Sequence, residues 1–113
     1  MRFMIMVKAN ADSEAGKMPE EALIAAMATY HEELAKAGVL LDASGLQPTS
    51  KGWRIRYEGG RRSIVDGPFA ETKEQLGGYF LIEAADLDAA LSWATRCPGS
   101  QHGTIEVRPI WTM

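Results

Sequence analysis

Residues 66–79 read Asp66-Gly67-Pro68-Phe69-Ala70-Glu71-Thr72-Lys73-Glu74-Gln75-Leu76-Gly77-Gly78-Tyr79. The stretch joins a strand that ends at Asp66 to an apolar strand that starts near Gly77. A Gly-Pro turn after Asp66 holds its carboxylate at the point where the first strand stops. Lys73 and Glu74 follow on a short connection, which is where a rigid scaffold presents functional side chains. We therefore predict a site here, although the residue types do not specify a reaction.

A β-hairpin precedes this stretch. Residues 53–57 and 62–66 read as strands on either side of Gly59-Gly60, a dipeptide typical of tight hairpin turns. This turn predicts a register in which Trp53 faces Asp66, and because strand side chains alternate, one face collects Trp53, Ile55, Tyr57, Ile64 and Asp66. We expect Asp66 to be mostly buried at the end of this apolar face. Desolvation would raise its pKa unless a cation such as Lys73 or Arg108 offset it.

The other face of the hairpin is basic. It carries Arg54, Arg56, Glu58, Arg61 and Ser63, and these arginines form a group of four with Arg62 that Glu58 partly neutralises. No aromatic residue interleaves with this face, as a platform for nucleic-acid bases would require. The formal net charge of −3 also argues against a nucleic-acid surface. We interpret the arginines as a solvated or interfacial face and expect no nucleic-acid partner.

The flanking sequence predicts two helices and four more strands. Residues 19–37 carry apolar residues at helical spacing and stop at Gly38, and a second helix runs from the N-cap Asp86 to Arg96. Strands are predicted at 3–7, 39–46, 77–84 and 104–110. The order is that of an α+β, ferredoxin-like split βαβ unit with an inserted β-hairpin.

Residues 3–7 predict a partner subunit. Every position in this run is apolar, whereas a strand with one wet face alternates. Helices on one side of a small sheet leave its other face to be covered by a second copy. We therefore expect a homodimer built by packing of sheet faces, to which the aromatic Trp111 contributes.

Composition places the chain among soluble globular proteins. Its 113 residues suit one domain, 1–113, with 46% hydrophobic and 24% charged residues. Cys97 is the single cysteine, which fits a reducing cytoplasm and reads as a small buried residue. We expect no signal peptide and no membrane-spanning segment. We also expect no metal or cofactor, because no Cys or His pair has ligand spacing and no phosphate loop is present.

The signature at 66–79 resembles that of DGPF-domain proteins of the YCII-like superfamily. Its flanking motifs are in register with the resemblance: Ala37-Gly38, Gly45-Leu46-Gln47-Pro48 and Ile105-Glu106-Val107-Arg108-Pro109. The resemblance implies a ferredoxin-like domain that pairs as a dimeric α/β barrel, with a largely unassigned function. Some members of the wider superfamily are regarded as enzymes with a His–Asp pair. Aligned through Gly38, the histidine of that pair falls near Met27, so this chain departs from the pattern.

Two classes of function stay open. The first is a small-molecule enzyme or ligand-binding protein with its pocket between helix 19–37 and the sheet, around Asp66. Its catalytic candidates are Asp66 and His31, and its ligand-binding candidates are Tyr30, Trp53, Lys73, Glu74 and Arg108. The second is a non-catalytic dimeric regulatory or protein-interaction module, in which Asp66 caps a turn, His31 packs its ring, and Lys73 and Glu74 are surface charges.

Overall fold

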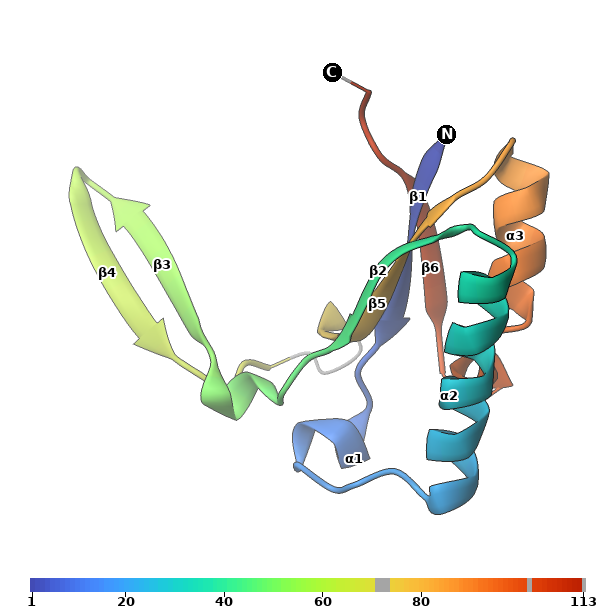
Figure 1. Ribbon diagram of the computed structural model, residues 1–113. Helices are drawn as coiled ribbons and strands as arrows, with labels where there is room; N and C mark the ends of the chain where they lie inside the picture. Colours follow the sequence, from blue (N-terminus) through green and yellow to red (C-terminus); the bar gives the residue numbers. More distant parts are fainter. Residues whose placement is uncertain (71–73, 102, 113) are drawn as a thin grey trace.

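The computed structural model describes residues 1–70, 74–101 and 103–112 and has a mixed α+β architecture with antiparallel sheets (Figure 1). The elements follow the chain in this order: β1 (Arg2–Lys8), α1 (Ala11–Glu14), α2 (Glu21–Lys36), β2 (Leu40–Gly45), a 3-10 turn (Thr49–Lys51), β3 (Trp53–Glu58), β4 (Arg61–Asp66), β5 (Leu76–Glu83), α3 (Leu87–Thr95), a second 3-10 turn (Pro98–Gln101) and β6 (Ile105–Pro109). Each strand and each long helix predicted from the sequence is present. The α+β class is confirmed.

Four strands form the main sheet in the order β2-β5-β1-β6. β1 lies inside this sheet, where Ile5 pairs with Phe80 of β5 on one side and with Val107 of β6 on the other. Helices α2 and α3 lie on the same side of the sheet (Figure 1). The opposite face is not covered by a helix in the described part of the chain, and we call it the open face.

The hydrophobic core fills the space between the sheet and these two helices. Its largest fully buried side chains are Phe3, Ile5, Leu34, Ile82 and Cys97. Burying an aliphatic or aromatic side chain of this size contributes about 1.5–3 kcal/mol, so these contacts dominate the folding free energy. Burial also raises the pKa of the Cys97 thiol. Cys97 is thus the small buried residue that the sequence predicts.

Local sequence signals set the ends of the two long helices. Gly38 follows α2 with a φ of 73°, and its N–H donates to the carbonyl of Ala35. A residue with a Cβ would be strained in this left-handed conformation, which is why glycine ends the helix. At the start of α3 the carboxylate of Asp86 accepts a hydrogen bond of 2.8 Å from the N–H of Ala89. Asp86 is the N-cap that the sequence predicts.

The sequence does not predict the first helix, α1, because residues 10–17 are mostly small or polar. Asn10 and Ser13 form a capping box in which the Ser13 N–H donates to Asn10 Oδ1 and the Asn10 N–H donates to Ser13 Oγ, both at 2.9 Å. The helix is only four residues long. It has no buried residue, so no apolar periodicity could have revealed it.

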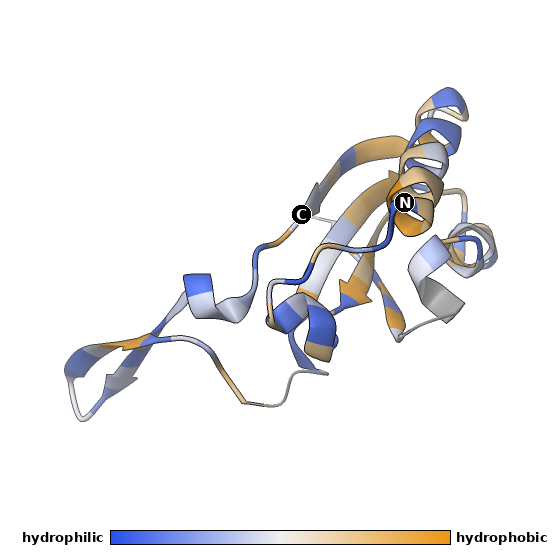
Figure 2. Ribbon diagram, turned by 90° about the horizontal axis from the view of Figure 1, so that it is seen from below, coloured by the Kyte–Doolittle hydropathy of each residue, from blue (hydrophilic) through white to orange (hydrophobic). Residues whose placement is uncertain are grey.

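Strands β3 and β4 form a separate two-stranded sheet, which we call the arm. The predicted register is confirmed, since Trp53 pairs with Asp66 and Glu58 with Arg61. The arm projects from the side of the main sheet that is opposite the helices (Figure 1), and Figure 2 shows hydrophobic and hydrophilic residues side by side in it. It also explains a radius of gyration of 15.8 Å, against about 13 Å for a compact domain of this length.

The predicted burial of Asp66 is wrong for the single chain. Asp66 is exposed, and so is every other residue of the arm. The register places these side chains on one face, as expected, but the arm extends away from the core and nothing in the described chain covers that face. The alternation of side chains determines which residues share a face, whereas only tertiary contacts determine whether that face is buried.

A compact polar network anchors the arm to the body. The carboxylate of Glu14 accepts hydrogen bonds from the Thr49 N–H, at 3.0 Å, and from the Thr49 hydroxyl. Thr49 Oγ1 accepts a further hydrogen bond of 3.1 Å from the Phe69 N–H. The Phe69 ring in turn stacks under the guanidinium of Arg54, 3.9 Å from the ring centroid. Residues around the Gly-Pro turn therefore have a structural role.

Within the described residues, no helix is long and apolar enough to cross a membrane.

Replacing Gly67 with alanine should destabilise this anchor. A Cβ at Gly67 would lie 1.7 Å from the carbonyl oxygen of Thr49, so the backbone must shift. We expect Gly67→Ala to lower the free energy of unfolding by about 1–3 kcal/mol, the usual cost of overpacking. Arg61→Ala, an exposed change on the same arm, serves as the control and should alter it by less than about 0.5 kcal/mol. Equal urea midpoints for the two variants would contradict the anchoring role.

Candidate functional site

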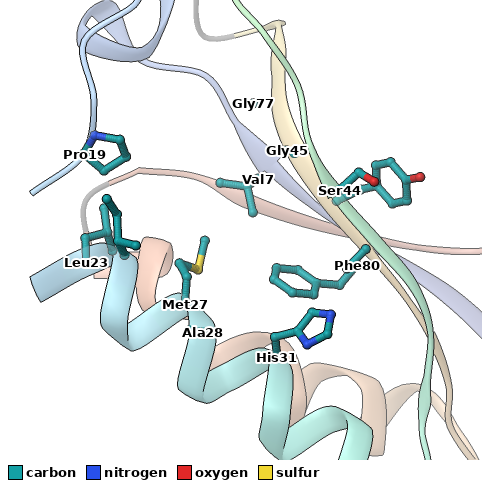
Figure 3. A pocket seen from close by; sticks show the side chains of 14 residues that line it. Val7, Pro19, Leu23, Met27, Ala28, His31, Ser44, Gly45, Gly77 and Phe80 are labelled. Carbon is teal, nitrogen blue, oxygen red and sulfur yellow. The ribbon is translucent and has the colours of Figure 1, made fainter. Parts of the chain in front are cut away.

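A cavity of about 460 Å³ opens between α2 and the adjoining ends of β2 and β5 (Figure 3). Its walls come from α2, from the segment before it and from three strands: Val7, Pro19, Leu23, Ile24, Met27, Ala28, His31, Ala43, Ser44, Gly45, Gly77, Gly78, Tyr79 and Phe80. Most of these residues are apolar. The predicted position of a pocket, between the first long helix and the sheet, agrees with this geometry.

Small residues on the sheet create the cavity. Ala43 pairs with Phe80, and Gly45 pairs with Gly78, so these four residues share the face that looks toward α2. A glycine opposite a glycine leaves that part of the face without side chains. A Cβ built on Gly45 meets no heavy atom within 4 Å, whereas one on Gly78 would lie 3.0 Å from the Ser44 carbonyl oxygen. Gly78 thus lets β2 approach β5, and Gly45 leaves space.

Helix α2 provides the opposite wall. Leu23, Met27 and His31 recur every four residues and therefore lie on one stripe of the helix. In Figure 3, Met27 and His31 extend from α2 toward the sheet, with the His31 imidazole near Phe80. Leu23 and Met27 are half-buried and His31 is exposed, so the sheet residues that line the cavity do not cover this stripe completely. The helix and the sheet together leave an apolar space with one imidazole at its edge.

His31 is the main polar group of this cavity. Among the described lining residues, Tyr79 is the other titratable one, and it follows the alternation of β5 onto the face opposite that of Phe80. The Tyr79 hydroxyl donates a hydrogen bond of 2.9 Å to Asp42 Oδ2. An imidazole can donate and accept hydrogen bonds and can transfer protons near neutral pH. His31 can thus orient a polar group of a ligand or exchange a proton with it.

The predicted site residues lie in different parts of the chain. Asp66 and Trp53 are on the exposed arm, and neither lines this cavity. Glu74 is exposed, and Lys73 lies outside the described residues. The cavity beside α2 therefore has His31 at its edge and does not include Asp66, because the arm holds Asp66 away from α2, and a pocket around Asp66 stays a prediction.

Tyr30 belongs to the core. Its hydroxyl donates a hydrogen bond of 2.8 Å to the Trp93 carbonyl oxygen, which ties α2 to α3. The ring meets that of Phe80 edge to face, with centroids 5.1 Å apart. Burial raises the pKa of Tyr30 far above the ordinary value of a tyrosine. These contacts give Tyr30 a structural role, and ligand binding by it stays a prediction.

Arg108 lies on the open face of the main sheet. Its Nε is 3.8 Å from Glu106 Oε2, and the Lys8 ammonium is 3.2 Å from Glu106 Oε1. Lys8 is the more buried of the two cations, with 14% of its side chain exposed against 72% for Arg108. Arg108 is therefore paired on the sheet and is not the counter-ion of Asp66. Across the described residues, no group of three His, Cys, Asp or Glu side chains could hold a metal ion.

Sequence reasoning missed the residues that shape the cavity and anchor the arm. Gly45 lies within a predicted strand, and its lack of a side chain opens the space. Glu14 and Thr49 were not singled out, because their pairing joins segments 35 positions apart in the sequence. A glycine at the end of a strand, with a second one in the expected partner strand, is the signal that could have indicated the cavity.

The profile of the YCII-related domain family matches residues 1–113. The chain belongs to this family. A curated relative, the uncharacterized protein R00369 of Rhizobium meliloti (strain 1021), is 36% identical over 96 residues, which cover 83% of this chain and 77% of the relative. The resemblance to the YCII-like superfamily, inferred from the signature at 66–79, is thereby confirmed.

A solved structure shares the fold of this YCII-related chain. It is the 5-chloro-2-hydroxyhydroquinone dehydrochlorinase (TftG) from Burkholderia phenoliruptrix AC1100, in complex with 2,5-dihydroxybenzoquinone. The two chains superpose with a TM-score of 0.57, covering 99% of this chain and 94% of the other, at 17% identity. At this identity the likeness is one of fold.

Removing the Tyr30 hydroxyl should test whether this residue is structural. Tyr30→Phe leaves the Trp93 carbonyl without that donor, and we expect a loss of about 1 kcal/mol in the free energy of unfolding, measured in urea. Tyr79→Phe removes an exposed hydroxyl and should cost less than about 0.5 kcal/mol. Unchanged stability in Tyr30→Phe, together with weaker ligand binding, would instead support the ligand-binding prediction.

Proposed function

We propose that this YCII-related protein binds a small, largely apolar molecule in the cavity between α2 and the β2–β5 edge. This proposal rests on one observation. Two paired glycines, Gly45 and Gly78, open an apolar space next to a single imidazole. Its volume of about 460 Å³ lies within the roughly 300–1,000 Å³ of typical small-molecule sites. Apolar walls supply affinity, and His31 supplies orientation.

An enzymatic role would use His31 as the proton-transferring group. The resemblance places the superfamily's histidine near Met27, which is one helical turn before His31 on the same wall of the cavity. His31 can reach the same cavity from the next turn of α2, since positions four apart lie on one helical face. None of the described lining residues is a carboxylate, so Asp66 would have to come from outside this cavity to complete a His–Asp pair.

The structural neighbour suggests which ligands to try first. TftG is a dehydrochlorinase that acts on a hydroquinone and was solved with a dihydroxybenzoquinone, a planar ring with polar substituents. A ring of this kind matches an apolar cavity with one polar group at its edge. We take hydroxylated six-membered rings as the first ligand class and 2,5-dihydroxybenzoquinone as the probe.

The arrangement of the chain also supports a paired assembly. The strand order β2-β5-β1-β6, with a helix after the first strand and another after the third once the arm is set aside, supports a ferredoxin-like arrangement. The open face carries Met4 opposite Leu81, both half-buried, and Met6, which is 7% exposed. We propose that two copies pack these faces together as a dimeric α/β barrel in the cytoplasm. A dimer that acts only through protein contacts is the second candidate function, favoured by the exposed apolar side chains of the arm.

Filling the cavity should weaken ligand binding without unfolding the protein. Gly45→Val adds a β-branched side chain at a strand position where a new Cβ has free space. In isothermal titration calorimetry with 2,5-dihydroxybenzoquinone, and in a thermal-shift screen of ring compounds, we expect the affinity of every binder to fall at least about tenfold. Gly103→Val adds the same side chain at an open glycine outside the cavity and should leave binding unchanged.

Two results would contradict the proposal. One is a ligand that binds wild type and Gly45→Val equally well, which would place its site elsewhere. The other is a screen in which no compound shifts the melting temperature of the wild-type protein, which would favour the protein-contact function.

A further inference from the structure

The arm presents an uncovered apolar face. Four large side chains on it are well exposed: Trp53 at 68%, Ile55 at 60%, Tyr57 at 74% and Ile64 at 58%. The register shows that they lie together, because Ile55 pairs with Ile64, and because Trp53 and Tyr57 flank Ile55 on the same side of β3. They form one continuous patch.

The size of this face and the isolation of its two strands both indicate a binding surface. These side chains expose on the order of 500 Å² of mostly apolar surface, given the 150–250 Å² that a single aromatic side chain can bury. A patch of this size matches the largest patches on monomeric proteins, which are often functional. The arm is also a two-stranded sheet of its own, and an isolated hairpin is at best marginally stable in water. Both properties indicate that another surface covers it.

The net charge of the arm bears on which surface covers its apolar face. Four arginines against Glu58 and Asp66 give the segment from Trp53 to Asp66 a net charge of +2, and since the whole chain carries −3, the remaining residues carry −5. Three of the arginines, Arg54, Arg56 and Arg61, lie with Glu58 on the opposite face of the arm, and Arg62, which pairs with Tyr57, borders the apolar patch. Arms of like net charge repel each other, which disfavours arm-to-arm stacking, and the opposite net charges of the arm and of the remaining residues attract two copies at long range.

We propose that the apolar face of the arm docks on the body of a second copy of this chain, and that in the pair each arm clasps its partner. This goes beyond ligand binding and beyond packing of the open sheet faces, because it assigns an interface to a different surface. The arm projects on the side of the main sheet where a second copy seated on the open face would lie (Figure 1). Two arms, each burying about 500 Å² against a similar area of the partner, supply roughly 2,000 Å², enough for a stable specific interface.

The clasp also accounts for the position of Asp66. This residue shares the apolar face with Trp53, its cross-strand partner, at the base of the arm. In a single chain it is exposed. In the clasped pair the face is covered, and Asp66 is placed against the second copy, so the partner contributes the surroundings of this carboxylate.

Adjacent residues on opposite faces of β4 provide a matched test. Ile64→Asp puts a charge into the apolar face, and Ser63→Asp puts the same charge on the basic face, opposite Arg56. Both positions are exposed, so neither change should unfold the chain. By sedimentation equilibrium we expect a wild-type dimer, a dimer dissociation constant raised at least about tenfold by Ile64→Asp, and one within about twofold of wild type for Ser63→Asp.

A photo-crosslink identifies the occupant directly. We would place p-benzoylphenylalanine at position 57 and irradiate a mixture of isotope-labelled and unlabelled full-length chains. Crosslinks between labelled and unlabelled chains, mapped by mass spectrometry to residues outside the arm, support the clasp. A wild-type monomer at concentrations up to about 100 μM, which would leave the face to a different protein, overturns it. Crosslinks from arm to arm also overturn it.

The outcomes separate this inference from the proposed function. A wild-type dimer that Ile64→Asp leaves intact removes the arm from the interface, while the pairing of open sheet faces stands. Ligand binding is tested at Gly45, in the body, and is decided independently of either result.

Discussion

The packing of α2 and α3 onto one face of the central strand β1 is the constraint on which the rest of the chain depends. Phe3 and Ile5 point into this layer and meet side chains from both neighbouring strands and from both helices. The Tyr30 hydroxyl then links the two helices through the Trp93 carbonyl. Because all this burial occurs on one side, the domain has two layers, and its open face and its arm remain available for contacts with other molecules.

The cavity follows from the same layer where its packing stops. Toward the ends of β2 and β5 the sheet residues shrink to Ala43, Gly45 and Gly78, while α2 continues past them with Leu23 and Met27. A well-packed interior leaves few voids larger than a water molecule, so a space of this volume reflects residue choice and not loose folding. The site thus arises from missing side chains on the sheet and from one imidazole on the helix.

The segment around Gly67 and Pro68 has a structural role that its polar residues do not indicate. Gly67 lies against the Thr49 carbonyl, and Phe69 is held by the Thr49 hydroxyl and by Arg54. Glu14 completes the network from the opposite side. This anchor holds the arm away from the body, and thereby separates Asp66 and Trp53 from the cavity that contains His31.

The sequence by itself determined the elements, their order and the hairpin register. Helical spacing in residues 19–37, the N-cap Asp86 and the Gly59-Gly60 turn are local signals, and each acts through backbone angles or hydrogen bonds among near neighbours in the chain. The tertiary structure alone decided which faces are buried and which polar groups meet. Asp66 shares a face with Trp53 in any case, but that face is exposed because the Glu14–Thr49 anchor directs the arm outward. Likewise, Gly45 and Gly78 are 33 positions apart and become the wall of a cavity only when β2 pairs with β5. Burial and long-range contacts depend on how elements distant in sequence pack together. Local sequence patterns do not determine that packing.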